Sequence, residues 1–247
     1  MYEALLLVWH NLHQFGRRAD FLGIFCLSEK KELKYMKKNV IAMSFSFLVL
    51  GIFIAILAVP ASREVFKSLS SAHPFIMGFI KFGLLATVGE ILALRLRKKS
   101  WDLPVCVWQK ALIWGAIGIA ITFMMSSYKG AVAAITESGL IPGKNSVFLK
   151  ALYTSAIMNL SFGPTFMAFH KCTDKWLELG AEKKPHKLSD VVGGVDWYGF
   201  VSFTLFKTIP LFWIPAHTVT FLLPGEYQVI MAASLSIALG IILSIKK

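Results

Sequence analysis

Six apolar segments of roughly membrane-spanning length constrain this chain more than any other feature. They occupy residues 39–60, 75–94, 111–128, 146–170, 198–223 and 227–245. A helix rises ~1.5 Å per residue, so ~20 apolar residues cross the ~30 Å hydrocarbon core of a bilayer. The composition agrees, because only 16% of the residues are charged, against about a quarter in soluble domains. The sequence therefore predicts an all-α, polytopic transmembrane helical bundle with about six spans.

The lysines and arginines predict how these spans are oriented. With six spans, the connecting segments alternate between the two sides of the membrane, and both termini lie on the same side. Of the 26 lysines and arginines, nineteen lie in the termini and the connecting segments on that side, and five lie in the connecting segments on the other side. Lys81 and Lys207 lie inside spans. Basic residues concentrate on the cytoplasmic side of a membrane, so both termini are predicted to be cytoplasmic. The net charge of +12 does not indicate nucleic-acid binding, because the basic residues are distributed between apolar segments.

The chain divides into a basic cytoplasmic segment, residues 1–38, and a transmembrane domain, residues 39–247. The first segment is either an interfacial helix that touches anionic lipid or an ordinary cytoplasmic tail. It lacks the basic start, apolar run and small-residue cleavage site of a signal peptide. Within the transmembrane domain, the stretch 184–194 has the composition of a linker. We expect it to join four spans to the last two.

Small residues predict where the helices approach one another closely. Gly83 and Gly89 lie in the second span, and they allow a neighbouring helix to pack tightly against that face. In the sixth span, Ala232, Ser236 and Gly240 recur every four residues. Residues four apart share a helix face, so this stripe predicts a second tight contact.

Glu90 is the one acidic residue well inside a predicted span. A buried carboxylate needs a partner or a proton. Lys207 lies at a comparable depth in the fifth span, and its long side chain can reach back toward Glu90. We expect the two to pair within a polar pathway. A purely structural ion pair, or a carboxylate that reaches the membrane interface, is equally compatible with the sequence.

The fourth span combines a polar residue with a weak point in the helix. Asn159 precedes the Gly163–Pro164 pair, which we expect to loosen the helix in mid-membrane. Freed carbonyl groups are tolerated there only beside other helices or a water-lined cavity. His170 and Asp174 share a helix face, but two ligands without a third do not make a metal site. The sequence thus predicts no metal and no cofactor.

The fifth span holds Pro210 and Pro215, which we expect to kink it. Trp213, His217 and Thr220 follow one face of this span at helical spacing. The kink would turn this partly polar stripe toward the interior of the bundle. The alternative is that His217 is a hydrogen-bonded core histidine.

The order and separation of these motifs resemble those of the Mpv-type family, the twenty-two-kilodalton peroxisomal membrane protein and its mitochondrial inner-membrane relatives. Three groups of residues between 74 and 245 carry the resemblance: Pro74, Gly83 and Gly89–Glu90; Met158–Asn159 and Pro164; Trp213, Pro215, His217, Thr220–Phe221 and Pro224. Glu90 stands where the family usually has Asp, His217 where it has Gln, and Thr220 where it has Asn. The resemblance implies a small, pore-forming multispan protein tied to organelle metabolite or nucleotide balance.

The function predicted from these residues is a channel or transporter for small solutes, with Glu90, Asn159, Lys207, His217 and Thr220 along the pathway. Two alternatives remain open: a non-transporting membrane interaction or stress-related protein, and an intramembrane enzyme. No motif for nucleophilic or metal-assisted catalysis is present, so we expect no enzyme. The expected partners are the lipid bilayer and small solutes. The sequence leaves open whether the chain forms a homo-oligomer.

The location of the protein follows from what the first residues lack. There is no arginine-rich, acid-poor transit peptide at the start of the sequence. We therefore expect a bacterial member of the family in the cell inner (cytoplasmic) membrane, as a multi-pass protein. An organelle membrane is the alternative.

Overall fold

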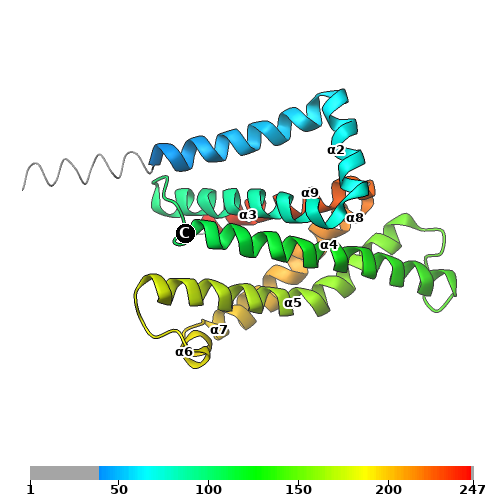
Figure 1. Ribbon diagram of the computed structural model, residues 1–247. Coiled ribbons are helices and arrows are strands. Elements are labelled where there is room, and N and C mark those ends of the chain that lie inside the picture. The colour runs from blue at the N-terminus through cyan, green and yellow to red at the C-terminus, as the bar shows by residue number, and fades with distance from the viewer. Residues whose placement is uncertain (1–38, 246–247) are drawn as a thin grey trace, which may run out of the picture.

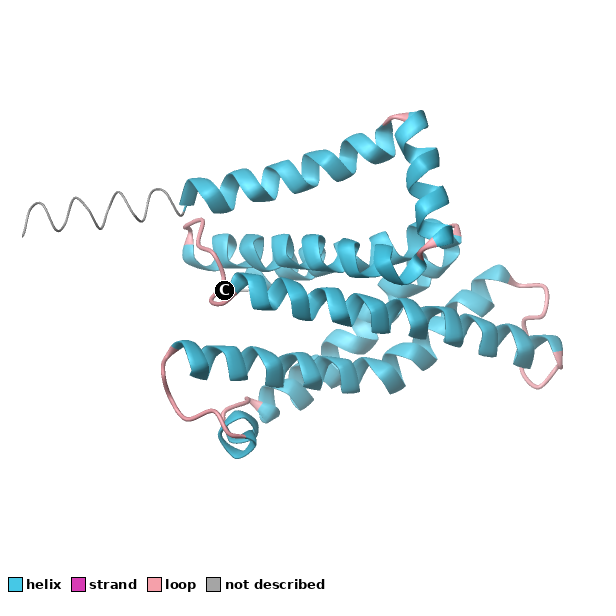
Figure 2. Cartoon of the chain, viewed as in Figure 1, coloured by secondary structure: helices cyan, strands magenta, loops and turns pink. Residues whose placement is uncertain are grey.

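The computed structural model describes residues 39–245, with side chains through residue 239. Every regular element in this range is a helix, and short loops join the helices (Figure 2). In chain order these are the helix Asn39–Ala58, α2 (Pro60–Ala72), α3 (Pro74–Lys98), α4 (Val107–Glu137), α5 (Val147–Ala181), α6 (Leu188–Gly193), α7 (Trp197–Gly199), the π-helix η1 (Phe200–Trp213), α8 (Ile214–Leu222) and α9 (Gly225–Ile245). The predictions for residues 1–38 lie outside the described residues.

Four helices of the described part of the chain are long and apolar enough to cross a membrane. They are Asn39–Ala58, α3, α4 and the continuous stretch Trp197–Leu222. The first of them buries only 17% of its apolar window inside the protein, and Phe47 and Leu48 are 62% and 63% exposed. An outward apolar surface of this kind suits hydrocarbon and is unusual in water. The predicted all-helical class is therefore confirmed, as is the presence of helices apolar enough to span a membrane.

Helix α3 lies at the centre of the bundle, between α4 and α9 (Figure 1). Its contact with α4 depends on two glycines, since a Cβ on Gly78 would lie 2.9 Å from the carbonyl oxygen of Gly118. Gly83 belongs to the same contact, where a Cβ would lie 3.2 Å from the carbonyl oxygen of Ala111. The absence of side chains lets the two backbones approach closely. Gly83 thus has the packing role that its spacing predicts.

The contact between α3 and α9 is also close. A Cβ on Gly89 would lie 2.8 Å from Oγ of Ser236, and Ala232 beside it is 5% exposed. The predicted stripe of small residues in the last helix therefore faces Gly89 of α3. Gly240, the third member of that stripe, lies beyond the side chains that the structure describes.

The stretch with two prolines adopts a wider helix than expected. From Phe200 to Trp213 the backbone is a π-helix that contains Pro210, and α8 begins one residue before Pro215. A proline removes one amide donor and crowds the carbonyl four residues earlier. A π-helix bonds to the carbonyl five residues earlier, as the Ile214 amide does with Ile209. The structure thus accommodates Pro210 by a change of helix type.

Several predicted boundaries were wrong. The third and fourth spans were expected at 111–128 and 146–170, but α4 has 31 residues and α5 has 35. Helix α5 runs without a break through Gly163 and Pro164, so the expected loosening is absent. The residues between the first two predicted spans are not a simple loop, because Pro60–Ala72 forms α2, and the expected linker 184–194 contains α6. Apolar length marks only the part of a helix that faces hydrocarbon, so polar turns beyond it were missed.

Candidate functional site

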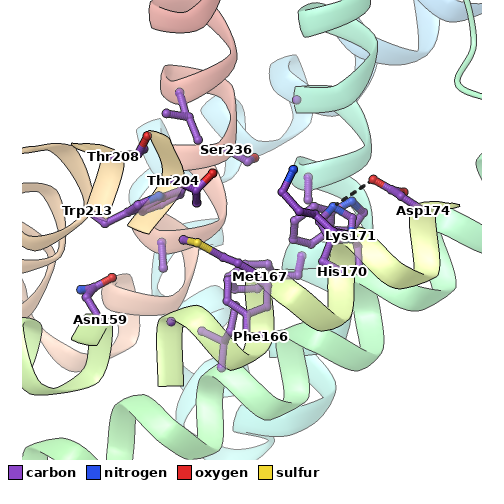
Figure 3. A pocket seen from close by; sticks show the side chains of 18 of the residues that line it. Asn159, Phe166, Met167, His170, Lys171, Asp174, Thr204, Thr208, Trp213 and Ser236 are labelled. Atoms are coloured by element: carbon purple, nitrogen blue, oxygen red, sulfur yellow. Dashed lines mark ion pairs between the residues drawn. The ribbon is translucent and has the colours of Figure 1, made fainter. Parts of the chain in front are cut away.

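A cavity of about 650 Å³ lies inside the bundle. Helices α3, α4, α5, α8 and α9 and the π-helix η1 all contribute to its wall, and Figure 3 shows side chains from several of them converging on it. Most of the lining is apolar, including Phe82, Met158, Phe166 and Met167. Polar side chains lie in three places, around Asn159, around Asp174, and at Thr204, Thr208 and Ser236 (Figure 3). The first two are described below.

Asn159 and His217 form the polar group in the middle of the bundle. Nδ2 of Asn159 donates to the carbonyl oxygen of Ser155 at 2.8 Å and lies 3.0 Å from Nδ1 of His217. The two side chains are 3% and 9% exposed. The indole of Trp213 stacks on the His217 imidazole with ring centroids 5.3 Å apart. These contacts hold the imidazole in one orientation at the cavity wall.

Helices α5 and α8 bring this pair together. Oγ of Ser155 donates to the carbonyl oxygen of Ile214 at 2.7 Å, which ties the two helices directly beside the pair. Ser155 is fully buried, and a buried hydroxyl that is bonded in this way avoids the cost of an unsatisfied polar group. The helix junction after η1 therefore sets the position of His217 relative to Asn159.

An ionic cluster of Glu90, Lys110 and Asp174 forms the second polar group. Nζ of Lys110 lies 2.9 Å from Oε2 of Glu90 and 2.7 Å from Oδ1 of Asp174. Nε1 of Trp114 donates to Oε1 of Glu90 at 2.7 Å. The lysine and Glu90 side chains are only 15% and 20% exposed. One ammonium group thus links α3, α4 and α5 through two carboxylates.

The expected partner of Glu90 was wrong. Lys207 is exposed on the surface of η1, and Glu90 pairs with Lys110. Lys110 lies just before the third predicted span, 111–128, but α4 begins at Val107 and carries it in its first turn. From there its side chain reaches back to Glu90. Lys110 and Trp114 are four residues apart and share a face of α4, which is the signal that could have identified them.

His170 completes the surroundings of the cluster. Its Nε2 lies 3.5 Å from Oδ2 of Asp174, and its ring lies against Trp114 with centroids 4.2 Å apart. Glu90, His170 and Asp174 offer ligand atoms within 4.8 Å of one another, which is the type of group that can hold a metal ion. Lys110 lies between the two carboxylates, so its charge already serves as the cation. The arrangement is therefore that of an ion-paired cluster.

The cavity brings together many, though not all, of the residues singled out from the sequence. Those on its wall come from three separate sequence motifs: Gly89, Glu90, Asn159, Gly163, Trp213 and His217. Those elsewhere lie at helix contacts or on the surface: Gly83, Pro164, Lys207, Pro210, Pro215 and Thr220. Thr220 is fully buried, but its hydroxyl donates to the carbonyl oxygen of Ala216 in its own helix at 2.9 Å. The expectation that Lys207 and Thr220 line the same interior as His217 is therefore wrong.

Comparison with protein-family models, with curated proteins and with solved structures finds no match for this chain.

Proposed function

We propose that the protein is a six-span membrane protein whose central cavity is part of a passage for small solutes. The six spans would be the four apolar helices together with α5 and α9, which have 35 and 21 residues. At ~1.5 Å per residue both are long enough to cross ~30 Å of hydrocarbon. The start of the helix Asn39–Ala58 and the C-terminal end lie at the same end of the bundle (Figure 1). This placement supports an even number of spans.

The orientation that we propose places that end of the bundle in the cytoplasm. The last turn of α3 with the loop that follows it, and the segment after α5, also lie there (Figure 1). They carry a cluster of basic residues: Arg95, Arg97, Lys98, Lys99, Lys183, Lys184 and Lys187. The opposite end carries α2 and the loop between α4 and α5, which have few basic residues. The charge difference supports both termini on the cytoplasmic side of an inner membrane.

The single observation that carries the proposed passage is the cavity itself. It extends from the Asn159–His217 pair in the middle of the bundle to the Glu90 cluster near the basic end. Its apolar wall with polar groups at separate places suits a small organic solute that has an apolar body and at least one polar group. As it moves through the cavity, such a solute can give up hydrogen bonds to water and form hydrogen bonds to His217 or Asp174 in their place.

The proposed membership of the Mpv-type family draws support from where its motifs lie. Glu90, Asn159 and His217 belong to three motifs that are far apart in the sequence, and all three reach the wall of one cavity. Residues that resemble a family's motifs would be expected to converge if they share a function. A solute passage is also what the resemblance implies.

The test is solute flux through the purified protein in liposomes. Proteoliposomes are moved into solutions of glycerol, lactate or betaine, and the rate of swelling is followed by light scattering. We expect faster entry than into protein-free vesicles for at least one solute. His217→Leu should lower that rate several-fold, because it removes a polar group from the cavity wall.

A matched control uses the same introduced residue on the outer face of the same helix. Val219 of α8 is 53% exposed and does not line the cavity, so Val219→Leu should leave the flux unchanged. Equal flux in His217→Leu, Val219→Leu and the parent would contradict a passage through this cavity. No flux of any solute through the parent would favour the non-transporting alternative.

A further inference from the structure

Lys81 is a buried cation without an acidic partner. It lies in the first third of the apolar helix α3, and its side chain is 2% exposed. Nζ donates to Oγ of Ser70 at 2.8 Å and lies 4.4 Å from the centroid of the Phe66 ring. Among the described residues no carboxylate forms an ion pair with it. Burying a charge is costly unless it is paired, so one serine and one aromatic ring compensate it only in part.

Lys81 reaches a small polar pocket of about 90 Å³, separate from the central cavity. Its wall includes Ser70 of α2 and Gly225 at the start of α9, and α2 lies at the end of the bundle opposite the loop between α3 and α4 (Figure 1). Hydroxyl groups of Ser70, Thr122 and Ser126 contribute to its wall. Its size is that of a few water molecules at ~30 Å³ each, which also admits one small inorganic ion.

A second lysine and a helix N-terminus face the same pocket. Nζ of Lys129 lies 3.1 Å from Oε1 of Gln228 and 3.9 Å from the place where a Cβ on Gly225 would be. Gly225 is the first residue of α9, a helix of 21 residues, and the amide groups at a helix start carry partial positive charge. Two ammonium groups and a positive helix end thus converge on one pocket.

The pocket also contains an acidic residue, Glu226, in the first turn of α9. It forms no ion pair with Lys81 or Lys129 in the part of the chain that the structure describes. One carboxylate does not balance two lysines and a helix N-terminus, so the pocket keeps an excess of positive charge. Like charges that converge on one pocket repel one another, and the buried Lys81 is screened least by solvent.

We propose that this pocket binds a small oxyanion of the phosphate or sulfate type. Such an ion has several acceptor oxygens, which matches donors on different sides of the pocket: Nζ of Lys81, Nζ of Lys129, and the hydroxyl groups of Ser70 and Ser126. The Thr122 hydroxyl is not among them, because it already donates to the carbonyl oxygen of Gly118 at 2.7 Å. The oxyanion is either a free inorganic ion or the phosphate of a lipid headgroup, and both present the same chemistry. The inference does not depend on transport through the central cavity.

The experiment measures thermal unfolding of the full chain, purified in a neutral detergent. Sodium phosphate and sodium sulfate should raise the Tm by several degrees in a saturable way, and sodium chloride at matched ionic strength should not. In a chloride buffer without phosphate or sulfate, Lys81→Met should have a higher Tm than the parent, because it removes a buried charge that has no acidic partner. Added phosphate should then produce no shift in this variant. If Lys81 had only a structural role, its replacement would lower the Tm and would leave the response to phosphate unchanged.

Two further variants keep the result interpretable. Lys129 is exposed, so Lys129→Gln should fold normally and should weaken the apparent affinity for phosphate several-fold. Lys144 lies outside the pocket and pairs with Glu137 at 3.3 Å, so Lys144→Met should respond to phosphate as the parent does.

The two sources of the oxyanion are separated by a second titration. Mixed micelles with phosphatidic acid test the lipid headgroup, and micelles with phosphatidylcholine control for lipid alone. A shift with phosphatidic acid but not with inorganic phosphate assigns the oxyanion to lipid, provided that Lys81→Met abolishes it. Equal shifts in the parent, Lys81→Met and Lys129→Gln, equal shifts with chloride and phosphate, or no shift with any anion would overturn the proposal.

Discussion

Replacing Lys110 with methionine should destabilise the bundle more than replacing a lysine on its surface. The change leaves the carboxylates of Glu90 and Asp174 without the ammonium that lies 2.9 and 2.7 Å from them. Breaking a fully buried ion pair costs ~3–5 kcal/mol, and breaking an exposed one costs ~0–1 kcal/mol. The lysine and the two carboxylate side chains are 15%, 20% and 38% exposed. We therefore expect a loss of about 2–4 kcal/mol.

Glu90→Gln should cost less, about 1–2 kcal/mol, because the new amide oxygen can still accept from Nε1 of Trp114. In the double variant with Lys110→Met the losses should not add, and the coupling should be at least ~1 kcal/mol. Unfolding is measured by circular dichroism in a titration of the detergent-solubilised protein with a denaturing detergent.

The matched control is the lysine that the sequence suggested as the partner. Lys207 is exposed on η1, so Glu90→Gln and Lys207→Met should add to within ~0.5 kcal/mol. A larger coupling for Glu90 with Lys207 than with Lys110 would refute the ionic cluster described above.

Three further predictions concern packing, the buried polar pair and orientation. Gly78→Ala should cost about 1–3 kcal/mol in thermal unfolding, because its Cβ would lie 2.9 Å from the Gly118 carbonyl oxygen, whereas Gly130→Ala meets nothing within 4 Å and should not destabilise. His217→Gln should unfold within about 1 kcal/mol of the parent, since an amide can still bond to Asn159, whereas His217→Leu should cost about 1–3 kcal/mol; equal losses would show that the hydrogen bond is unimportant. Reporters placed after residue 247 and within α2 should lie on opposite sides of the membrane, and equal signals would contradict the proposed orientation.

The sequence by itself determined the class of this fold and much of its packing. The helix Asn39–Ala58 could be located because hydrocarbon thickness sets a minimum apolar length, whatever the rest of the chain does. The contact of Gly89 with Ser236 could be anticipated in part, since small residues at helical spacing mark a packing face before the partner helix is known. Both features depend on the local chain alone.

The tertiary structure alone decided which polar groups meet. Lys207 was a reasonable partner for Glu90 because the two residues were expected at a similar depth in the membrane. An ion pair also depends on how each helix is rotated about its axis and on which helices are neighbours. Because α3 packs against α4 and η1 turns Lys207 outward, Lys110 reaches Glu90 instead. The pocket at Lys81 follows the same rule, because Ser70, Lys129 and Gly225 come from three other parts of the chain. The hydropathy of the sequence indicates how deep a residue lies in the membrane, but not toward which neighbouring helix its side chain points. Only the packing of the helices decides that direction.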